Sequence, residues 1–279
     1  MIIITNILRD YYNFDQFKIY KNNNRNVIKY QDKMYYLEKI YDVSEVYEQY
    51  ALVGNMPYFY KFILNVNGSV VTEYNGDNYV LLLVNNNQGQ KTPILINNGM
   101  YLNWRNIWIA RSDYIEEYYD RIRGETPLIN ESFDYYMGLL EFAICYLGDD
   151  DYYGVGYLQH KHFDYNELNN PLNIKVDFLE RDFAEYLKYI FITGEYKNID
   201  MKELILENRY NYNFNLVIAR IIYPNYYFNL LDDIIVGYEN ENILFNIIER
   251  NQEFEAYLKN IIAEISLIYP IKKIPFMRF

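Results

Sequence analysis

The chain has 279 residues, 51% of them hydrophobic and 23% charged, and this balance excludes an intrinsically disordered protein. Its net charge of −12 opposes binding to nucleic acid, whose phosphates attract clustered Lys and Arg side chains. No run approaches the ~18 apolar residues of a membrane span, and the run at 1–5 lacks the basic flank of a signal peptide. We therefore expect a folded, cytoplasmic protein that binds neither nucleic acid nor a membrane.

The first third of the chain predicts short strands interrupted by one helix. Runs of β-branched and aromatic residues favour strands. The predicted strands are 17–20, 27–30, 34–40, 59–66, 70–74 and 79–84. Asp42 and Glu45 have the spacing of a helix N-terminal capping box, and an amphipathic helix follows them. Asn67-Gly68 and Asn75-Gly76 favour hairpin turns between the later strands.

Residues 85–98 lose this periodicity and gather Asn, Gly and Pro, which indicates a hinge. Beyond them, apolar residues recur at helical spacing. The predicted helices are 104–122 (ended by Gly124), 132–147 (ended by Gly148), 181–191, 216–222, 230–236, 243–248 and 254–265.

Several side chains on these helices have expected roles. The stripe of Trp104 and Trp108 is typical of core packing. Cys145, in an apolar helix, is expected to be a buried and inert thiol. Glu141 is expected to pair with a buried Arg, such as Arg220, or with an amide. Glu185 is expected to stabilise the N-terminus of its helix electrostatically.

One short stretch holds both histidines of the chain. His162, Asp164 and Asn169 have the H-x-D-x-x-x-x-N spacing of a phosphotransferase catalytic loop, and Asp177 follows eight residues after Asn169. In that chemistry the first Asp accepts the proton of an attacking hydroxyl, while the Asn and the second Asp hold Mg²⁺. A polar turn with this spacing by chance is the alternative. Asp177 stands in an apolar run, so it needs either a metal or a donor such as Arg181 or Lys175.

Four longer segments carry a resemblance to a known family. They are Tyr74-Asn75-Gly76-Asp77-Asn78-Tyr79-Val80-Leu81-Leu82 with its preceding turn, Phe133-Asp134-Tyr135-Tyr136-Met137-Gly138-Leu139-Leu140-Glu141, Val176-Asp177-Phe178-Leu179-Glu180-Arg181-Asp182-Phe183-Ala184 and Ala219-Arg220-Ile221-Ile222-Tyr223-Pro224. The chain resembles the aminoglycoside-phosphotransferase-like kinase fold, and within it the spore-coat CotS/YutH-like proteins and their uncharacterised relatives. The resemblance implies a two-lobed, protein-kinase-like α+β fold. Its small lobe would be antiparallel β at 1-86, its hinge 87-100, and its helical large lobe 101-279 with a catalytic-loop-like segment at 157-182.

The resemblance also implies roles for single residues. Asp164 would be the general base, His162 a residue that braces the loop, and Asn169 and Asp177 the Mg²⁺ ligands beside ATP. Under a second alignment His160 takes the first loop position and His162 the place of the base, which leaves no general base.

The chain departs from the family where ATP would bind. Family strands of the type Tyr-Val-Leu-Lys present a Lys to the phosphates, whereas this chain has Glu38 there and Lys39 one place later. Successive strand residues face opposite ways, so Lys39 reaches a nucleotide only if a β-bulge re-aims it. Glu45 or Glu48 would be the helix partner of that Lys. The loop at 21–26 also lacks a glycine for close approach to phosphate.

We therefore expect a degenerate, pseudokinase-like protein with a binding or assembly role, similar to coat proteins and acting through protein partners. The alternative is an active ATP- and Mg²⁺-dependent phosphotransferase for a small hydroxylated substrate. A nucleotide-binding module without turnover is a third possibility.

Overall fold

The computed structural model describes residues 2–22, 25–57, 59–84, 95–101, 103–122, 126–148 and 153–274. The chain forms two compact units. The first comprises Met1–Ile94 and His160–Lys175, and the second comprises Leu95–Gln159 and Val176–Phe279. The segment with the H-x-D spacing therefore packs with the N-terminal part of the chain.

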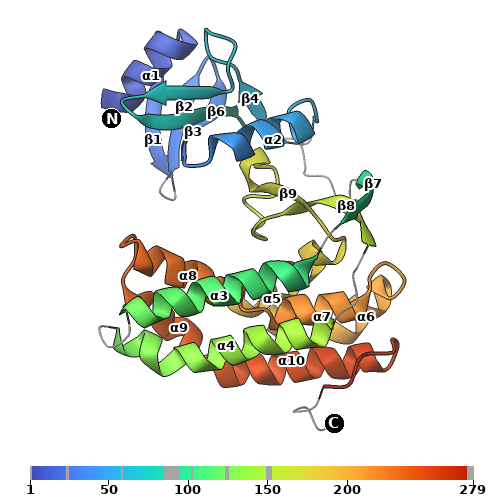
Figure 1. The fold of residues 1–279 in the computed structure, drawn as a ribbon. Helices are drawn as coiled ribbons and strands as arrows, with labels where there is room; N and C mark the ends of the chain where they lie inside the picture. The colour runs from blue at the N-terminus through green and yellow to red at the C-terminus, as the bar shows by residue number, and fades with distance from the viewer. Residues whose placement is uncertain are drawn as a thin grey trace. The chain divides into compact units, whose positions relative to one another are not determined.

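The first unit is built on an antiparallel sheet with the strand order β1-β2-β3-β6-β4, and β5 also pairs with β6 (Figure 1). The strands are β1 (Lys18–Asn22), β2 (Arg25–Tyr30), β3 (Lys33–Ile40), β4 (Lys61–Ile63), β5 (Val71–Tyr74) and β6 (Asp77–Leu83). Asn75 and Gly76 have φ of 54° and 83° and join β5 to β6, as predicted. This left-handed backbone suits Gly and Asn.

The turn at Asn67-Gly68 has a different role from the predicted one. β4 pairs with the Leu81–Leu83 end of β6, and β5 pairs with its Asp77–Val80 end. The two strands therefore follow each other along one edge of β6 and form no hairpin. Asn65 holds the intervening loop, because its Oδ1 accepts hydrogen bonds from the backbone N–H groups of Asn67 and Ser69 at 3.0 Å each.

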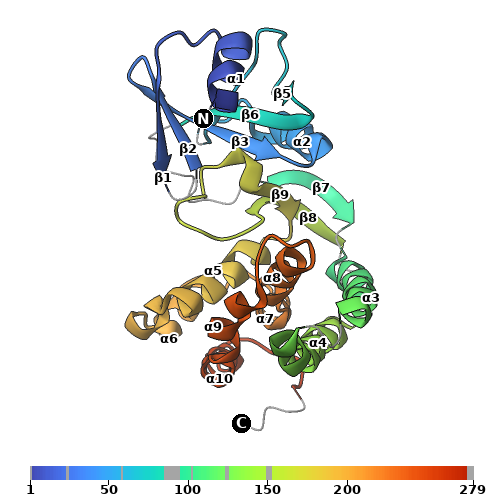
Figure 2. The same cartoon turned by 90° about the vertical axis from the view of Figure 1, so that its left-hand side faces the viewer.

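Two helices pack in this unit, of which only the second was predicted. α1 (Ile2–Tyr12) buries Ile7 and Leu8 against Ile28 and Leu37 of the sheet, and Figure 2 shows it lying against the strands. α2 (Val43–Val53) begins at Asp42, whose side chain accepts the Glu45 N–H at 3.0 Å, as the capping-box spacing predicts.

A three-stranded sheet, in the order β7-β8-β9, follows in the chain. It consists of β7 (Leu95–Tyr101), β8 (Tyr153–His160) and β9 (Ile174–Asp177). β7 falls in the stretch expected to be a linker, so part of that stretch is a strand. Its pairing with β8 has two register shifts, which fits the weak periodicity of its sequence.

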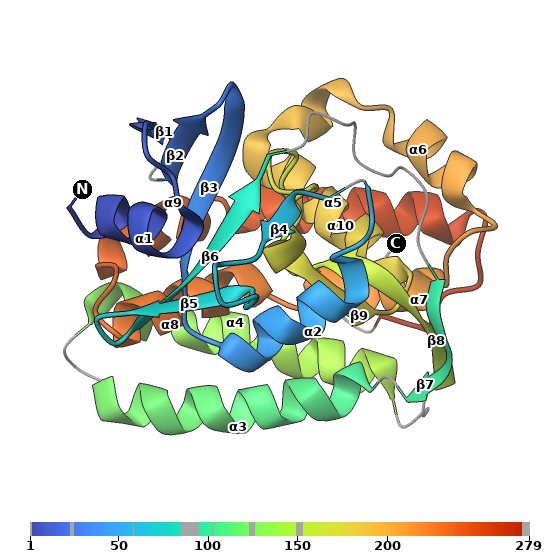
Figure 3. The ribbon, with the colours of Figure 1, turned by 90° about the horizontal axis from the view of Figure 1, so that it is seen from above.

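The second unit is largely helical. Its helices are α3 (Trp104–Ile122), α4 (Pro127–Leu147), α5 (Glu180–Thr193), α6 (Met201–Asn208), α7 (Phe214–Ile222), α8 (Asn225–Ile235), α9 (Phe245–Ile248) and α10 (Asn251–Ser266). α6 was not predicted. α3 runs alongside α4 (Figure 3). Gly148, with φ of 75°, ends α4 as predicted, whereas Gly124 lies outside the described residues.

The core of this unit confirms some expectations and corrects others. Trp104 and Trp108 are buried and stacked, as predicted. Cys145 and Glu141 are exposed, so the expectations of a buried thiol and of a Glu141–Arg220 pair are wrong. Only one stripe of α4 faces its neighbours, and these two positions lie outside that stripe. Within the described part of the chain, no helix has the length and apolarity needed to cross a bilayer.

Candidate functional site

The segment 160–175 is held in the first unit by contacts with the sheet and α2. Tyr60 N–H donates to the Asn169 carbonyl at 2.8 Å. Gln49, buried on α2, donates through Nε2 to the Leu172 carbonyl at 2.9 Å. Lys161 Nζ lies 2.8 Å from Glu45 Oε1. Glu45, the residue expected to assist nucleotide binding, thus pairs with this segment.

Within this segment, hydrogen bonds fix a compact polar turn. Asn173 accepts the His162 N–H at 3.0 Å and donates through Nδ2 to the His162 carbonyl at 2.8 Å. Asp164 Oδ1 accepts the Asn166 N–H at 2.8 Å. His160 Nε2 lies 3.1 Å from the Leu168 carbonyl. These bonds suit the polar-turn interpretation as well as a catalytic loop, and both histidine alignments stay open.

Arg25, the first residue of β2, is the cation that contacts Glu38 of β3. It directly follows the β1–β2 turn, since Asn22 pairs with Arg25. Its Nε lies 3.0 Å from Glu38 Oε1, and its Nη1 and Nη2 bind both oxygens of Glu167, the latter at 2.7 Å. Burial raises the pKa of Glu38, Arg25 opposes this rise, and the Glu167 carboxylate adds to it. Two carboxylates and one guanidinium therefore meet at Glu38, the position where the resemblance implies a lysine.

Lys39 faces the other way, as strand alternation predicts. In the fully described strands β3 and β6 the register runs without a shift from Tyr35 opposite Leu83 to Ile40 opposite Asn78. No bulge there re-aims Lys39. Its Nζ lies 2.8 Å from Asp77 Oδ1, and its side chain is 43% exposed.

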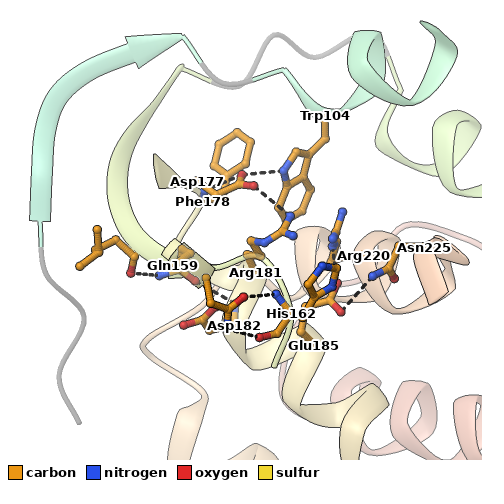
Figure 4. A network of polar contacts seen from close by, with 12 residues as sticks. Trp104, Gln159, His162, Asp177, Phe178, Arg181, Asp182, Glu185, Arg220 and Asn225 are labelled. Carbon is orange, nitrogen blue, oxygen red and sulfur yellow. Dashed lines mark hydrogen bonds and ion pairs between the residues drawn. The ribbon is translucent and has the colours of Figure 1, made fainter. Parts of the chain in front are cut away.

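Asp177 is buried in the second unit with donors around its carboxylate (Figure 4). Oδ1 accepts Trp104 Nε1–H at 2.7 Å and Phe178 N–H at 2.9 Å, and Oδ2 lies 3.1 Å from Arg181 Nη1. Arg181, one of the two partners proposed from the sequence, is therefore present. A guanidinium neutralises the carboxylate that a Mg²⁺ ion would need.

The residues expected to bind a metal are divided between the two units. Asp177 belongs to the second unit, whereas His162, Asp164 and Asn169 belong to the first. Among the described residues, no group of three or more His, Cys, Asp or Glu side chains is placed to hold a metal ion. The magnesium role that the resemblance implies for Asp177 stays a prediction.

Glu185 centres a buried network that the sequence did not indicate. Its Oε1 lies 2.7 Å from Arg220 Nε, and its Oε2 accepts Asn225 Nδ2–H at 3.2 Å. Burial opposes ionisation, but the charges of Lys188, Arg220 and Arg181 together lower the pKa of Glu185. Glu185 therefore pairs with Arg220. This is the role that was expected of Glu141. The partners of Glu185 lie 35 and 40 positions away, and no local pattern identifies them.

Comparisons with known proteins agree with the resemblance. The family model described as "Spore coat putative kinase YutH" matches residues 5–261. The endospore coat-associated protein YutH of Bacillus subtilis (strain 168) is 23% identical over 250 residues, covering 73% of this chain and 73% of that protein. The crystal structure of an aminoglycoside phosphotransferase from Alicyclobacillus acidocaldarius superimposes on this chain with a TM-score of 0.56 and 10% sequence identity. The match covers 90% of this chain and 92% of the phosphotransferase chain. The fold is thus the two-lobed, kinase-like α+β fold.

Proposed function

The chain belongs to the spore coat putative kinase YutH family, and from this premise we propose that it is a degenerate, pseudokinase-like protein with a binding or assembly role. In this proposal its kinase fold recognises protein partners of a coat-like assembly and transfers no phosphoryl group. The predicted cytoplasmic location then applies to the protein before it joins that assembly.

The environment of Asp177 carries the proposal. A Mg²⁺ ligand must offer oxygen lone pairs to a dication, and Arg181, 3.1 Å away, already neutralises this carboxylate. Both groups are buried, with 4% and 8% of their side chains exposed. Separating such a pair takes a carboxylate partner away from a buried guanidinium, which costs up to about 3–5 kcal/mol. Metal binding at Asp177 must offset that cost.

The charges near Glu38 support the same conclusion. A nucleotide phosphate placed near β3 meets the carboxylates of Glu38 and Glu167 as well as Arg25. These three groups sum to one negative charge when all are ionised, and like charges repel. Lys39 could have compensated this negative charge, but it pairs with Asp77.

Phosphate release from ATP in the presence of Mg²⁺ tests the absence of turnover. We expect wild type, Asp164→Asn and the matched control Asp32→Asn, at the exposed turn before β3, to release phosphate at the buffer rate. Release by wild type and Asp32→Asn that Asp164→Asn abolishes contradicts the proposal. That result would favour the alternative, an active kinase for a small hydroxylated substrate.

A second experiment tests the assembly role. The B. subtilis relative is named for its association with the endospore coat, and we propose the same association for this chain. Tagged wild type and Asp164→Asn, produced in a sporulating endospore-former, should both fractionate with the extracted coat in equal amounts. Recovery of wild type outside the coat fraction contradicts the assembly role, and loss of the variant alone contradicts its independence from catalysis.

A further inference from the structure

The second unit contains a cavity of about 340 Å³, and its described lining includes none of the residues expected to act in phosphoryl transfer. This volume falls within the range of small-molecule pockets. Aliphatic and aromatic side chains from five helices line most of it: Leu139, Phe191, Ile222, Tyr227, Leu230 and Phe254. Such walls suit the hydrocarbon part of a ligand.

Helix α5 connects the neighbourhood of Asp177 to the cavity, and the two lie at different positions along this helix. Arg181, the partner of Asp177, lies in the first turn of α5, whereas Lys188, Phe191 and Ile192 line the cavity. With a helical rise of 1.5 Å per residue, Phe191 lies about 15 Å along the axis from Arg181. A ligand here is therefore separate from the residues discussed for phosphoryl transfer.

One wall of the cavity carries a buried ammonium group. Lys188 is 8% exposed, and its Nζ donates to the Tyr223 carbonyl at 2.8 Å and to Asn225 Oδ1. Tyr223 and Asn225 also line the cavity. The nearest carboxylate is Glu185, at 3.4 Å. The contact with the charged acceptor, Glu185, is thus the longest of the three hydrogen bonds of this ammonium group.

Glu185 cannot fully neutralise Lys188, because it is shared. The same oxygen, Oε1, lies 2.7 Å from Arg220 Nε. One carboxylate thus serves two buried cationic groups, which leaves an excess of positive charge whenever Lys188 is protonated. Burial lowers the pKa of Lys188 to about 7, with Arg220 and Arg181 lowering it further and Glu185 opposing them. An anion in the cavity would relieve this excess.

We propose that the cavity binds a small apolar carboxylic acid, with its hydrocarbon part among the aromatic and aliphatic walls and its carboxylate at Lys188. The acid replaces the neutral amide oxygen of Asn225 as an acceptor of the ammonium group. This exchange gives a charge-assisted hydrogen bond, which is about twice as strong as one with a neutral acceptor. The site adds a ligand to the proposed binding role and does not depend on the absence of turnover.

Titration calorimetry with decanoate, and with decanol as its uncharged counterpart, tests the proposal. We expect saturable 1:1 binding of decanoate to the full chain. Leu139→Trp, which fills the cavity, should abolish binding, and Ile107→Trp, at a 61% exposed position on α3, should leave it unchanged. Lys188→Met should weaken decanoate at least tenfold and leave decanol unchanged.

Methyl NMR of wild type keeps the test independent of how the variants fold. Decanoate should shift the methyl signals of Ile222 and Ile247, which line the cavity, and not those of Ile7 and Ile28 in the first unit. Equal affinity for decanol and decanoate overturns the assignment of an acid. Absence of saturable binding, or shifts confined to the first unit, overturns the site itself.

Discussion

At the scale of single residues, Arg181 and Asp177 depend on each other for their charge balance. Asp177→Ala removes one acceptor of the buried Arg181 guanidinium and the acceptor of Trp104 Nε1–H, so we expect the free energy of unfolding to fall by about 3–5 kcal/mol in urea titrations. Asp77→Ala is the matched control, because Asp77 and Lys39 are 42% and 43% exposed. It should cost less than about 1 kcal/mol. Equal losses in both variants would contradict a structural role for Asp177.

Lys188 predicts a specific dependence of stability on pH. Its pKa falls to about 7 in the folded protein from an ordinary value of 10.5, under the influence of burial, Arg220 and Arg181 and against Glu185. Between these values the unfolded state binds more protons, so the contribution of Lys188 to stability grows as pH rises and is lost as pH falls through 7. Relative to Lys188→Met, wild type should gain up to about 1.4 kcal/mol per pH unit.

Denaturant titrations from pH 7 to 9 measure this difference. Lys202→Met, at an exposed position of α6, corrects for the loss of one positive charge. A wild-type advantage over Lys188→Met that stays constant or shrinks with rising pH would contradict the burial of a cation there.

Single-residue contacts were predictable from the sequence where they are local. Arg181 follows Asp177 by four positions, and an unpaired carboxylate in an apolar run requires a nearby donor. The outward direction of Lys39 follows from strand alternation. The partners of Glu185 and Arg25 come from distant segments, so only the tertiary fold brings them together. Asp164, His162 and Asn169 remain predictions, since their spacing is compatible with a catalytic loop and with a polar turn.

At the scale of elements, α4 contains a matched pair of glycines. Gly138 lies at an exposed position within the helix, where an added Cβ has no heavy atom within 4 Å. Gly138→Ala should therefore stabilise the protein by about 1 kcal/mol. Gly148 ends the helix with φ of 75° and ψ of −166°, a conformation almost restricted to glycine. Gly148→Ala should destabilise by about 1–3 kcal/mol, and thermal melts showing the same sign for both would contradict this assignment.

Arg25 connects β2 and β3 to the segment 160–175. Arg25→Met leaves Glu38 and Glu167 facing each other without a cation, so we expect a loss of about 1–3 kcal/mol and faster amide hydrogen exchange across 161–175. Lys29→Met, on the same strand, removes only an exposed contact with Asp32 and should have neither effect. Unchanged exchange in Arg25→Met would show that other contacts hold the segment.

Elements with strong local signals were predictable, and those defined by packing were not. The Asp42 cap of α2 and the Asn75-Gly76 turn depend on neighbouring residues alone. α1 was missed because its isoleucine-rich start has high β-propensity, whereas burial of Ile7 and Leu8 against the sheet stabilises a helix. Asn67-Gly68 has the same turn chemistry as Asn75-Gly76, but its flanking strands both pair with β6.

At the scale of the whole molecule, the fold was predictable because the resemblance rests on segments spread through both units. The family match over residues 5–261 extends it to most of the chain. Activity is a separate question, because the same fold holds active and inactive sites that differ in a few side chains. In the proposed function, the side chains that decide activity in this chain are Glu38, where the resemblance implies a lysine, and Asp177, which pairs with Arg181.

The thermal stability of the full chain with and without Mg²⁺-ATP tests this account most directly. A ligand present at 100 times its Kd stabilises the folded state by about 2.7 kcal/mol. We predict no increase in Tm at millimolar Mg²⁺-ATP beyond that caused by Mg²⁺ with an inert polyanion. A saturable increase in wild type that Asp177→Asn abolishes would show that Asp177 exchanges Arg181 for a metal, and would contradict the proposed loss of kinase function.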